Sequence, residues 1–387
     1  MKITTIKALV CDAYRTNFVF VRIDTDEGIH GVGEATMSFG ENAVVGCIKD
    51  LEPGFLGQDP LAIERLWHDT YRDFYWRGGP VLMSALSGLE MACWDIKGKV
   101  LNQPLWQLLG GKFRDRVPCY ANAWFVPART PAEFAAKARE AVGNGWTALK
   151  WDPFGRAYRD LSNQEFRTAL ACVAAVREAV GPGVDLMIEG HGRFDLQSAL
   201  RLGEALAEYN VLWFEEPLFP ENYEELAELR RRIRVPIAAG ERIYTRHDAR
   251  RFLELGCAHF MQPDISRVGV REMITMSAWA ETHGVAFCPH NPAGPITNAA
   301  TLQVAAALPN FFLMETMATD VPWRKDITTE ELRLEDGAMV VPDKPGLGID
   351  LCEEAIAAHP QKVYHLRHYR GDLTSIRPAD AAAWFKR

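Results

Sequence analysis

The sequence predicts an α/β fold, in which a (β/α) barrel is joined to a smaller α+β module. From about residue 117 onward, short apolar runs alternate with amphipathic stretches of roughly ten to fifteen residues, which is the pattern of repeated βα units. The apolar runs number eight, as an eight-stranded parallel barrel requires. The first 116 residues follow a different pattern, and a chain of 387 residues exceeds the usual length of one domain.

Residues 1–116 are predicted to form the α+β module. Alternating apolar residues indicate strands over Ile3–Val10 and Phe18–Asp24, and a Gly-rich turn follows the second strand. Helical periodicity then covers three stretches, Glu41–Asp50, Pro60–Tyr71 and Leu82–Lys99. We therefore predict a domain boundary near residue 116.

The barrel is predicted over residues 117–330. Its eight expected strands are Pro118–Phe125, Thr147–Trp151, Val184–Glu189, Val211–Glu216, Ile237–Glu241, His259–Asp264, Val285–His290 and Phe312–Met317. Helices between them include Asp195–Tyr209, which opens on a capping Asp, and Arg271–Thr282. The last segment, residues 331–387, holds a strand-like run over Ala338–Val341, and we expect this segment to return to the N-terminal module.

Composition narrows the class of partner. With 48% hydrophobic and 24% charged residues the chain has the composition of an ordinary globular protein, and no stretch of about 18 apolar residues predicts a membrane span. The formal net charge is −8, and we interpret the densest basic run, Arg230–Arg234, as the solvated face of a helix. We therefore expect neither a membrane nor a nucleic acid as a partner.

The cysteines indicate a reducing compartment. All eight are scattered without a CxxC pair, and most stand inside apolar runs, such as Cys93 between Ala92 and Trp94. We interpret them as reduced core residues of a cytoplasmic protein.

Acidic and imidazole side chains recur at the ends of consecutive predicted strands, 23 to 26 residues apart, at Glu189, Glu215, Glu241, Asp264, His290 and Glu315. One βα unit spans about this length, so the six side chains should converge at the C-terminal mouth of the barrel, where barrel active sites lie. Taken singly, Glu215 would merely end a strand, and Glu241 would form a buried ion pair with Arg242. Six such residues in register favour a functional site.

Three of these residues suit a metal ion. Glu189, Glu215 and Glu241 offer oxygen ligands from separate strands, without a cysteine or a ligand-spaced histidine pair beside them. Such a set favours a hard cation such as Mg²⁺ over zinc. A hard cation near carboxylates indicates removal of a weakly acidic proton beside a substrate carboxylate, because the metal stabilises the negative charge that develops.

Two histidines are candidates for proton transfer. His290 follows Asp264 by one barrel unit, so this carboxylate can orient the imidazole and raise its basicity, as a general base requires. His191 lies two residues beyond Glu189 and therefore on the same face of an extended chain, from which it would act as a general acid on a departing hydroxyl. The alternatives are a structural His290 beside proline and a loop His191 without a role.

Six motifs at the predicted strand ends form a set. They are Ala148-Leu149-Lys150, Glu189-Gly190-His191-Gly192-Arg193, Trp213-Phe214-Glu215-Glu216-Pro217, Ala239-Gly240-Glu241-Arg242, Gln262-Pro263-Asp264 and Pro289-His290. This set resembles the enolase superfamily, in its mandelate racemase branch and most closely its galactonate dehydratase-type sugar-acid dehydratases. The resemblance covers essentially the whole chain.

The resemblance implies a modified (β/α)7β TIM-like barrel, with a capping domain built from the N-terminal module and the C-terminal segment. It implies that Asp264 and His290 abstract the α-proton of the substrate and that His191 expels the β-hydroxyl as water. The implied ligands of Mg²⁺ are Glu189, Glu215 and Glu241.

The same resemblance implies roles around the substrate. Glu315 would hydrogen-bond the substrate carboxylate, and Lys150 would offset negative charge near the metal or steady a substrate oxygen. A buried ion pair between Lys150 and Asp152 is the alternative. The residues expected to bind substrate are Arg15, Asn17, Tyr75, Arg77, Asp152 and Arg193.

The sequence departs from the family pattern at two positions. The first metal ligand is commonly Asp, whereas Glu189 is one methylene longer. Racemases of this branch carry Lys-x-Lys, and here the motif reads Lys150-Trp151-Asp152. Without the second lysine, a racemisation with two opposed bases would fall to His191 and His290.

We therefore predict a Mg²⁺-dependent hydro-lyase of sugar-acid catabolism that converts an aldonate, such as galactonate, gluconate or arabinonate, to a 2-keto-3-deoxy acid. A racemase, epimerase or lactone cycloisomerase is the alternative with the same first step. Two further alternatives lie outside the family. One is a metal-dependent aldolase or sugar isomerase on an ordinary barrel, which uses different chemistry, and the other is a binding protein without catalytic activity. By analogy with the family we expect a homo-oligomer, from dimer to octamer.

Overall fold

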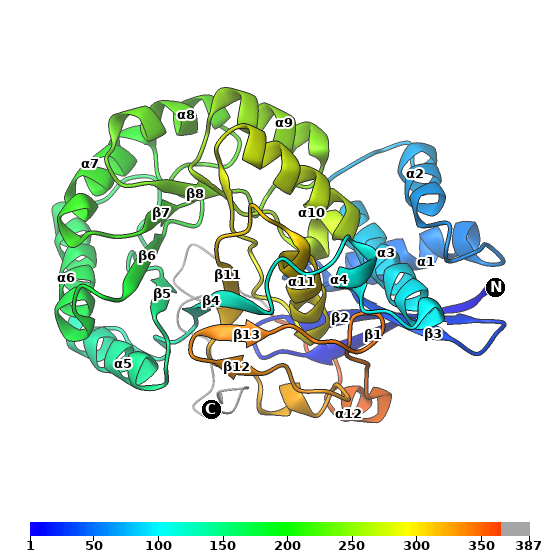
Figure 1. Cartoon of the computed structure of the whole chain (residues 1–387). Coiled ribbons are helices and arrows are strands. Elements are labelled where there is room, and N and C mark those ends of the chain that lie inside the picture. Colours follow the sequence, from blue (N-terminus) through cyan, green and yellow to red (C-terminus); the bar gives the residue numbers. More distant parts are fainter. Residues whose placement is uncertain (365–387) are drawn as a thin grey trace.

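The structure is a computed structural model that describes residues 1–364, and it consists of a ring of βα units beside a smaller α+β module (Figure 1). Its helices are α1 Glu41–Phe55, α2 Ile63–Asp73, α3 Pro80–Leu101, α4 Leu105–Leu108, α5 Pro131–Gly143, α6 Asn163–Val180, α7 Leu196–Leu206, α8 Tyr223–Arg232, α9 Arg246–Leu255, α10 Ile265–Thr282, α11 Pro295–Ala307 and α12 Glu353–Ala358. Its strands are β1 Ile3–Asp12, β2 Asn17–Thr25, β3 His30–Glu34, β4 Arg116–Asn122, β5 Ala148–Trp151, β6 Asp185–Glu189, β7 Trp213–Glu215, β8 Ile237–Ala239, β9 Phe260–Met261, β10 Ala286–Phe287, β11 Met314–Met317, β12 Leu334–Glu335 and β13 Ala338–Val340.

All eight strands predicted after residue 117 are present, as β4 to β11. They are parallel, β4 to β10 pair in chain order, and β11 pairs with the other side of β4. The observed strands are shorter than predicted, and several of them end early because the chain turns away at the carboxyl end. Strand β8, for example, ends at Ala239 because Gly240 has φ of 137°, which lies outside the strand region.

The strands curve around a shared interior. One buried cluster takes a residue from seven of the eight strand segments, all except β9, namely Tyr120, Ala148, Met187, Trp213, Ala238, Cys288 and Leu313. Helices α5 to α9 lie in an arc outside the strands (Figure 1). Within residues 1–364 no ladder joins β10 to β11, but backbone hydrogen bonds from Phe312 N to Phe287 O (2.9 Å) and from Glu315 N to Pro289 O (3.3 Å) cross this gap.

The helices of the ring begin on their capping residues. Asp195 accepts a hydrogen bond from Ser198 N (2.8 Å) and starts α7, as predicted. Helix α10 starts at Ile265 rather than at Arg271, because Asp264 caps it through Ser266 N. The sequence pattern misses this first turn because Gly269, with φ of 81°, interrupts the helical periodicity.

The N-terminal module has the two predicted strands, the three predicted helices, one further strand and the short helix α4. The Gly-rich stretch forms the predicted turn at Asp26–Gly28, where Gly28 has φ of 78°, and then continues as β3, which pairs antiparallel with β2. Its glycines allow α3 to pack directly on the strand. A Cβ at Gly31 would lie 2.1 Å from Ala92 O, and a Cβ at Gly33 would lie 2.0 Å from Gly88 O. The predicted turn is therefore confirmed at Gly28, whereas Gly31 and Gly33 serve close packing in a strand that was not predicted.

The C-terminal segment contacts the N-terminal module over the part that the structure describes. The predicted strand is confirmed as β13, which pairs antiparallel with β4. Farther on, Lys99 bonds Asp350 (3.0 Å), and the Asn17 amide exchanges two hydrogen bonds of 2.9 Å with the backbone of Lys362. The predicted segment runs to residue 387, so its last 23 residues lie outside the described part.

One buried carboxylate joins the N-terminal module to the ring of βα units. Glu34, at the end of β3, accepts hydrogen bonds from Gly294 N (2.6 Å) and Thr297 N (2.8 Å) at the start of α11. The N-cap of α11 is Gly294, which has no side chain to cap the helix. Glu34 therefore caps α11 from another domain and places negative charge at its positive end. Its own pKa is raised, because burial outweighs these hydrogen bonds.

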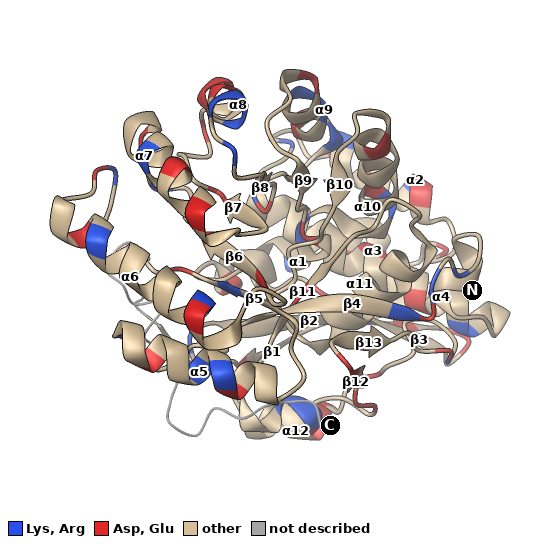
Figure 2. Cartoon of the chain, turned by 60° about the vertical axis from the view of Figure 1, so that its left-hand side comes forward, with Lys and Arg blue, Asp and Glu red and all other residues tan. Residues whose placement is uncertain are grey.

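The charged surface residues and most of the cysteines lie where the sequence predicts them. Lysine, arginine and acidic residues alternate over the outer helices of the ring (Figure 2), and Arg231, Arg232 and Arg234 are exposed. All eight cysteines are free and seven are buried, whereas Cys352 is only half-buried because it stands at the start of the short surface helix α12. None of the described helices is long and apolar enough to cross a membrane.

The substitution Gly33→Ala should destabilise the fold, because its methyl group would overlap the carbonyl oxygen of Gly88. We expect the free energy of unfolding in urea to fall by about 1–3 kcal/mol or more, the usual cost of overpacking. The control is Gly46→Ala in α1, where a Cβ meets no atom within 4 Å, and which should be neutral or stabilise by up to about 1 kcal/mol. Equal unfolding midpoints for the two variants would contradict this explanation of β3.

Candidate functional site

The site is one layer of polar side chains above the buried interior cluster. Side chains two residues apart on a strand share a face, so each cluster residue is followed by one that points to the mouth of the ring. The polar residues that follow at this spacing are Asn122, Lys150, Glu189, Glu215, His290 and Glu315. Five of these six were predicted as site residues, and Asn122 was missed.

Three carboxylates of this site can hold a metal ion. Glu189 and Glu215 end adjacent strands and are register partners, and Glu241 follows β8 by two residues. One oxygen of each lies within 4.8 Å of the others. Three hard oxygen donors at this separation suit a divalent cation that prefers oxygen ligands. The predicted metal ligands are therefore brought together by the fold.

Lys150 lies at the centre of the carboxylates. Its Nζ is 2.5 Å from Glu215, 3.1 Å from Glu315 and 3.3 Å from Glu189. The alternative ion pair with Asp152 is therefore wrong, because Asp152 pairs with Arg193 and His191 instead. Burial raises the pKa of Glu189 to about 7 and that of Glu215 to about 8, although Lys150 opposes both shifts. One ammonium group does not balance these carboxylates.

The predicted Asp264 and His290 pair is formed. His290 Nδ1 lies 2.8 Å from Asp264 Oδ2, while Nε2 faces Glu241 Oε2 at 3.3 Å. Burial by itself lowers the pKa of His290, but Glu241, Glu315 and Asp264 outweigh it and raise the pKa to about 9. Asp264 is held by Ser266, whose N and Oγ both donate to Oδ1. The ring of His290 is thus oriented with Nε2 toward the carboxylate cluster.

His191 lies at the other edge of the carboxylate cluster. Its backbone N donates to Glu189 Oε1 (2.6 Å), and its Nδ1 is 2.7 Å from Asp152. Asp152 and Arg193, both predicted to bind substrate, are buried behind this imidazole and contact each other. The fold thus places the two histidines beside different metal-ligand candidates, His290 at Glu241 and His191 at Glu189.

Glu315 is buried and held by two asparagines that the sequence did not indicate. Asn122 Nδ2 donates to Oε1 (2.7 Å), and Asn291 N donates to Oε2 (3.0 Å). These contacts, with Lys150, lower the pKa of Glu315 although burial acts against them. Two features of the sequence could have indicated these asparagines. Asn122 lies two residues after Tyr120, and Asn291 directly follows His290.

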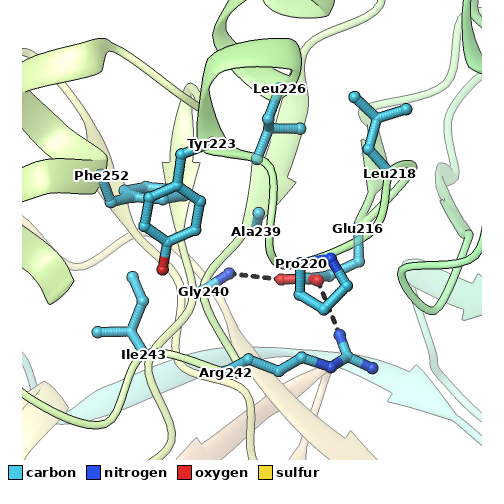
Figure 3. A pocket seen from close by; sticks show the side chains of 10 residues that line it. All are labelled: Glu216, Leu218, Pro220, Tyr223, Leu226, Ala239, Gly240, Arg242, Ile243 and Phe252. Atoms are coloured by element: carbon cyan, nitrogen blue, oxygen red, sulfur yellow. Dashed lines mark hydrogen bonds and ion pairs between the residues drawn. The ribbon is translucent and has the colours of Figure 1, made fainter. Parts of the chain in front are cut away.

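A second carboxylate supports the metal-ligand candidate Glu241 from outside the ring. Glu216 accepts hydrogen bonds from Gly240 N (2.9 Å) and Arg242 Nη1 (2.7 Å), over a small pocket that Tyr223 and other residues line (Figure 3). Arg242 also lies 2.9 Å from Glu241. The ion pair weighed as an alternative for Glu241 is therefore real, and it accompanies the three-carboxylate cluster instead of replacing it.

The other residues predicted to bind substrate are less clearly placed. Arg15 is half-buried, and the charges of Asp320 and Glu315 act on its guanidinium. Asn17 is bonded to the backbone of Lys362, and Arg77 donates to Arg72 O (3.0 Å). Tyr75 is 84% exposed. Among these four, the contacts place Arg15 nearest the site, and substrate binding by the others stays a prediction.

The fold and this site are typical of an enzyme class in which a carboxylate cluster can hold a metal ion, and comparison with known proteins gives the family. Residues 5–110 match the model of the mandelate racemase / muconate lactonizing enzyme N-terminal domain, and residues 133–355 match that of the enolase C-terminal domain-like family. The chain belongs to this branch of the enolase superfamily, whose enzymes use a metal ion.

Several relatives of this chain are named sugar-acid dehydratases. The D-gluconate dehydratase of Thermoproteus tenax is 35% identical over 372 residues, which are 95% of this chain and 73% of that protein. The D-galactonate dehydratase of Pectobacterium atrosepticum is 35% identical over 366 residues, 92% of this chain and 94% of that protein. A putative dehydratase from Mesorhizobium loti has a solved structure with a TM-score of 0.89 and 34% identity, over 94% of this chain and 99% of that chain.

The substitution Glu215→Gln should weaken metal binding, because it removes one of three negatively charged ligands. We expect the affinity for Mg²⁺ or Mn²⁺, measured by titration calorimetry, to fall at least about 100-fold, since changes behind the ligands alone cost 10–100-fold. Glu224→Gln in α8, a side chain that is 58% exposed, is the matched control and should bind as the wild type does. Unchanged affinity in Glu215→Gln would show that the ion binds elsewhere.

Proposed function

We propose that this protein is a Mg²⁺-dependent dehydratase of an aldonate. The observation that supports it most is the pair of histidines, one at each edge of the three-carboxylate cluster, in a chain of this family. Relatives named D-gluconate, D-galactonate and D-xylonate dehydratases at about 35% identity support a sugar acid as the substrate.

The chemistry of the ligands supports Mg²⁺ as the metal. Glu189, Glu215 and Glu241 are all-oxygen donors, which favour Mg²⁺ over softer ions. A putative L-alanine-DL-glutamate epimerase from Burkholderia xenovorans, with 28% identity and a TM-score of 0.90, was solved with magnesium and fumarate. When bound, a divalent cation polarises the substrate carboxylate and offsets the carboxylates that raise the pKa of His290.

His290 is the proposed general base. Its Nδ1 is held by Asp264, so Nε2 is the nitrogen that accepts the α-proton of the substrate. Lys150 is proposed to neutralise charge that develops on the substrate carboxylate, because its Nζ already lies among three carboxylates. Glu315, fixed by Asn122 and Asn291, is proposed to hydrogen-bond the same carboxylate.

His191 is the proposed general acid. After His290 takes the α-proton, the bond from the β-carbon to its hydroxyl oxygen breaks, and the electron pair leaves with the oxygen. His191 gives a proton to this oxygen, so the group leaves as water. The remaining enol becomes the 2-keto-3-deoxy acid, and both histidines return to their starting states by exchange of one proton with solvent.

The proposal also covers the closure of the barrel, the capping domain, the oligomeric state and the cellular location. We propose that the strands close into a (β/α)7β barrel, which the shared interior cluster supports, and that residues 1–116 and the segment after residue 330 form its capping domain. A homo-oligomer and a cytoplasmic location remain proposals as well, the second supported by eight unpaired cysteines.

The proposal predicts 2-keto acid formation from at least one aldonate. The protein is incubated with Mg²⁺ and a panel of five- and six-carbon sugar acids, and products are measured as semicarbazones. We expect His290→Asn to lower kcat at least about 100-fold, the usual share of general base catalysis. His283→Asn, at the exposed end of α10, is the matched control and should leave the rate unchanged.

The same experiment in D₂O separates dehydration from epimerisation. Solvent deuterium at the α-carbon without loss of water would favour a racemase or epimerase. Absence of both product and deuterium exchange across the panel would refute the proposed function.

A further inference from the structure

A second pair of aspartate and imidazole faces the site. His191 Nδ1 lies 2.7 Å from Asp152 Oδ2, close to the 2.8 Å between His290 Nδ1 and Asp264 Oδ2. Asp152 directly follows β5, and its side chain is 4% exposed, whereas that of His191 is 24% exposed. The aspartate therefore lies behind the imidazole, and the imidazole lies nearer to solvent and substrate.

Arg193 holds Asp152 in its charged form. The guanidinium pairs with Asp152 Oδ2, and it also donates from Nε to Gly190 O (3.0 Å) and from Nη1 to Gly155 O (3.0 Å). Phe154 N donates to the other oxygen, Oδ1, at 2.9 Å. Burial acts to raise the pKa of Asp152, but Arg193 and His191 outweigh it and hold the pKa below its usual value. The carboxylate is thus a fixed, ionised acceptor.

The backbone of His191 is constrained as well. Its φ is 53°, in the left-handed region that residues with a Cβ seldom adopt. Its N–H donates to Glu189, and its carbonyl accepts a hydrogen bond from Arg242 Nη2 (3.4 Å). A residue held in this conformation from several sides is typical of a functional site. The side chain therefore has one main orientation, with Nδ1 toward Asp152.

We propose that Asp152 is the positioning residue of His191 in the dehydration, so that the site holds two carboxylate–imidazole pairs with opposite tasks. The proposal rests on the proposed function. Because Nδ1–H is bound by Asp152, Nε2 is the nitrogen that gives its proton to the departing β-oxygen as the carbon–oxygen bond breaks. This role also explains why aspartate stands where racemases of the family carry the second lysine.

The leaving group distinguishes this role from a structural ion pair. Hydroxide must receive a proton as it leaves, whereas fluoride departs without one. A variant that has lost only the orientation of its acid should therefore fail on the hydroxy acid and still eliminate fluoride. A variant with a damaged fold, metal site or base should fail on both substrates.

The experiment compares an aldonate that the wild type converts with its 3-deoxy-3-fluoro analogue, at saturating Mg²⁺. For Asp152→Asn we expect kcat on the aldonate to fall about 100- to 10,000-fold, the range of general acid catalysis, with less than tenfold loss on the fluoro compound. KM and the affinity for Mg²⁺ should change little. Asp160→Asn, a nearby aspartate with a side chain that is 76% exposed, is the matched control.

Two further variants keep the test decisive. Asp152→Glu retains the charge beside Arg193 but displaces the carboxylate, and its loss should also be at least tenfold larger on the aldonate than on the fluoro compound. The double variant with His191→Asn should be no slower than His191→Asn alone, within about threefold, because residues that act as one unit are not additive.

The outcomes separate this inference from the proposed function. If the wild type converts the aldonate and Asp152→Asn keeps more than a tenth of its kcat, the inference is overturned and the function stands. Equal losses on both substrates also overturn it, since Asp152 would then serve the fold or the metal site. If the wild type dehydrates no sugar acid, the proposed function fails and the inference falls with it.

Discussion

The site depends on one electrostatic constraint: four carboxylates meet around a single buried ammonium. Lys150 contacts Glu189, Glu215 and Glu315 directly, and Glu241 completes the group. Burying uncompensated charge costs several kcal/mol per ion even after relaxation, so a second cation is the natural complement of this cluster. The neighbouring contacts follow from this constraint, because Trp213, Asn122 and Arg242 each fix one of the carboxylates in place.

The polar layer was largely predictable because it repeats with the βα unit. A parallel strand directs alternate residues inward, and each unit has similar length, so acidic residues spaced by 23 to 26 positions had to reach one mouth. Asn122 obeys the same register and was still missed. An amide side chain at a strand end does not by itself indicate a functional site. The role of Asn122 can be inferred only once Glu315 is known to lie beside it.

The features that escaped prediction depend on contacts between distant parts of the chain. Strand β3 was not predicted, because its glycines fit against the backbone of α3, about 60 residues later. The contact of Asn17 with Lys362, 345 residues away, was not predicted either. Asp152 looked like a substituted lysine facing the substrate. Its side chain is held by Arg193 and His191, in the loop after the next strand, β6, and no local pattern in the sequence indicates these contacts.

The carboxylate of Glu34 has a consequence for how this enzyme can be modified. It caps α11, and α11 directly follows the loop that carries His290. The N-terminal module is therefore also a structural part of the ring of βα units that carries the carboxylate cluster. A chimera that exchanges residues 1–116 to acquire a new substrate must carry a carboxylate at this position. Otherwise the graft would leave α11 uncapped and would disturb the loop that carries His290, although the exchange was meant to change only the choice of sugar.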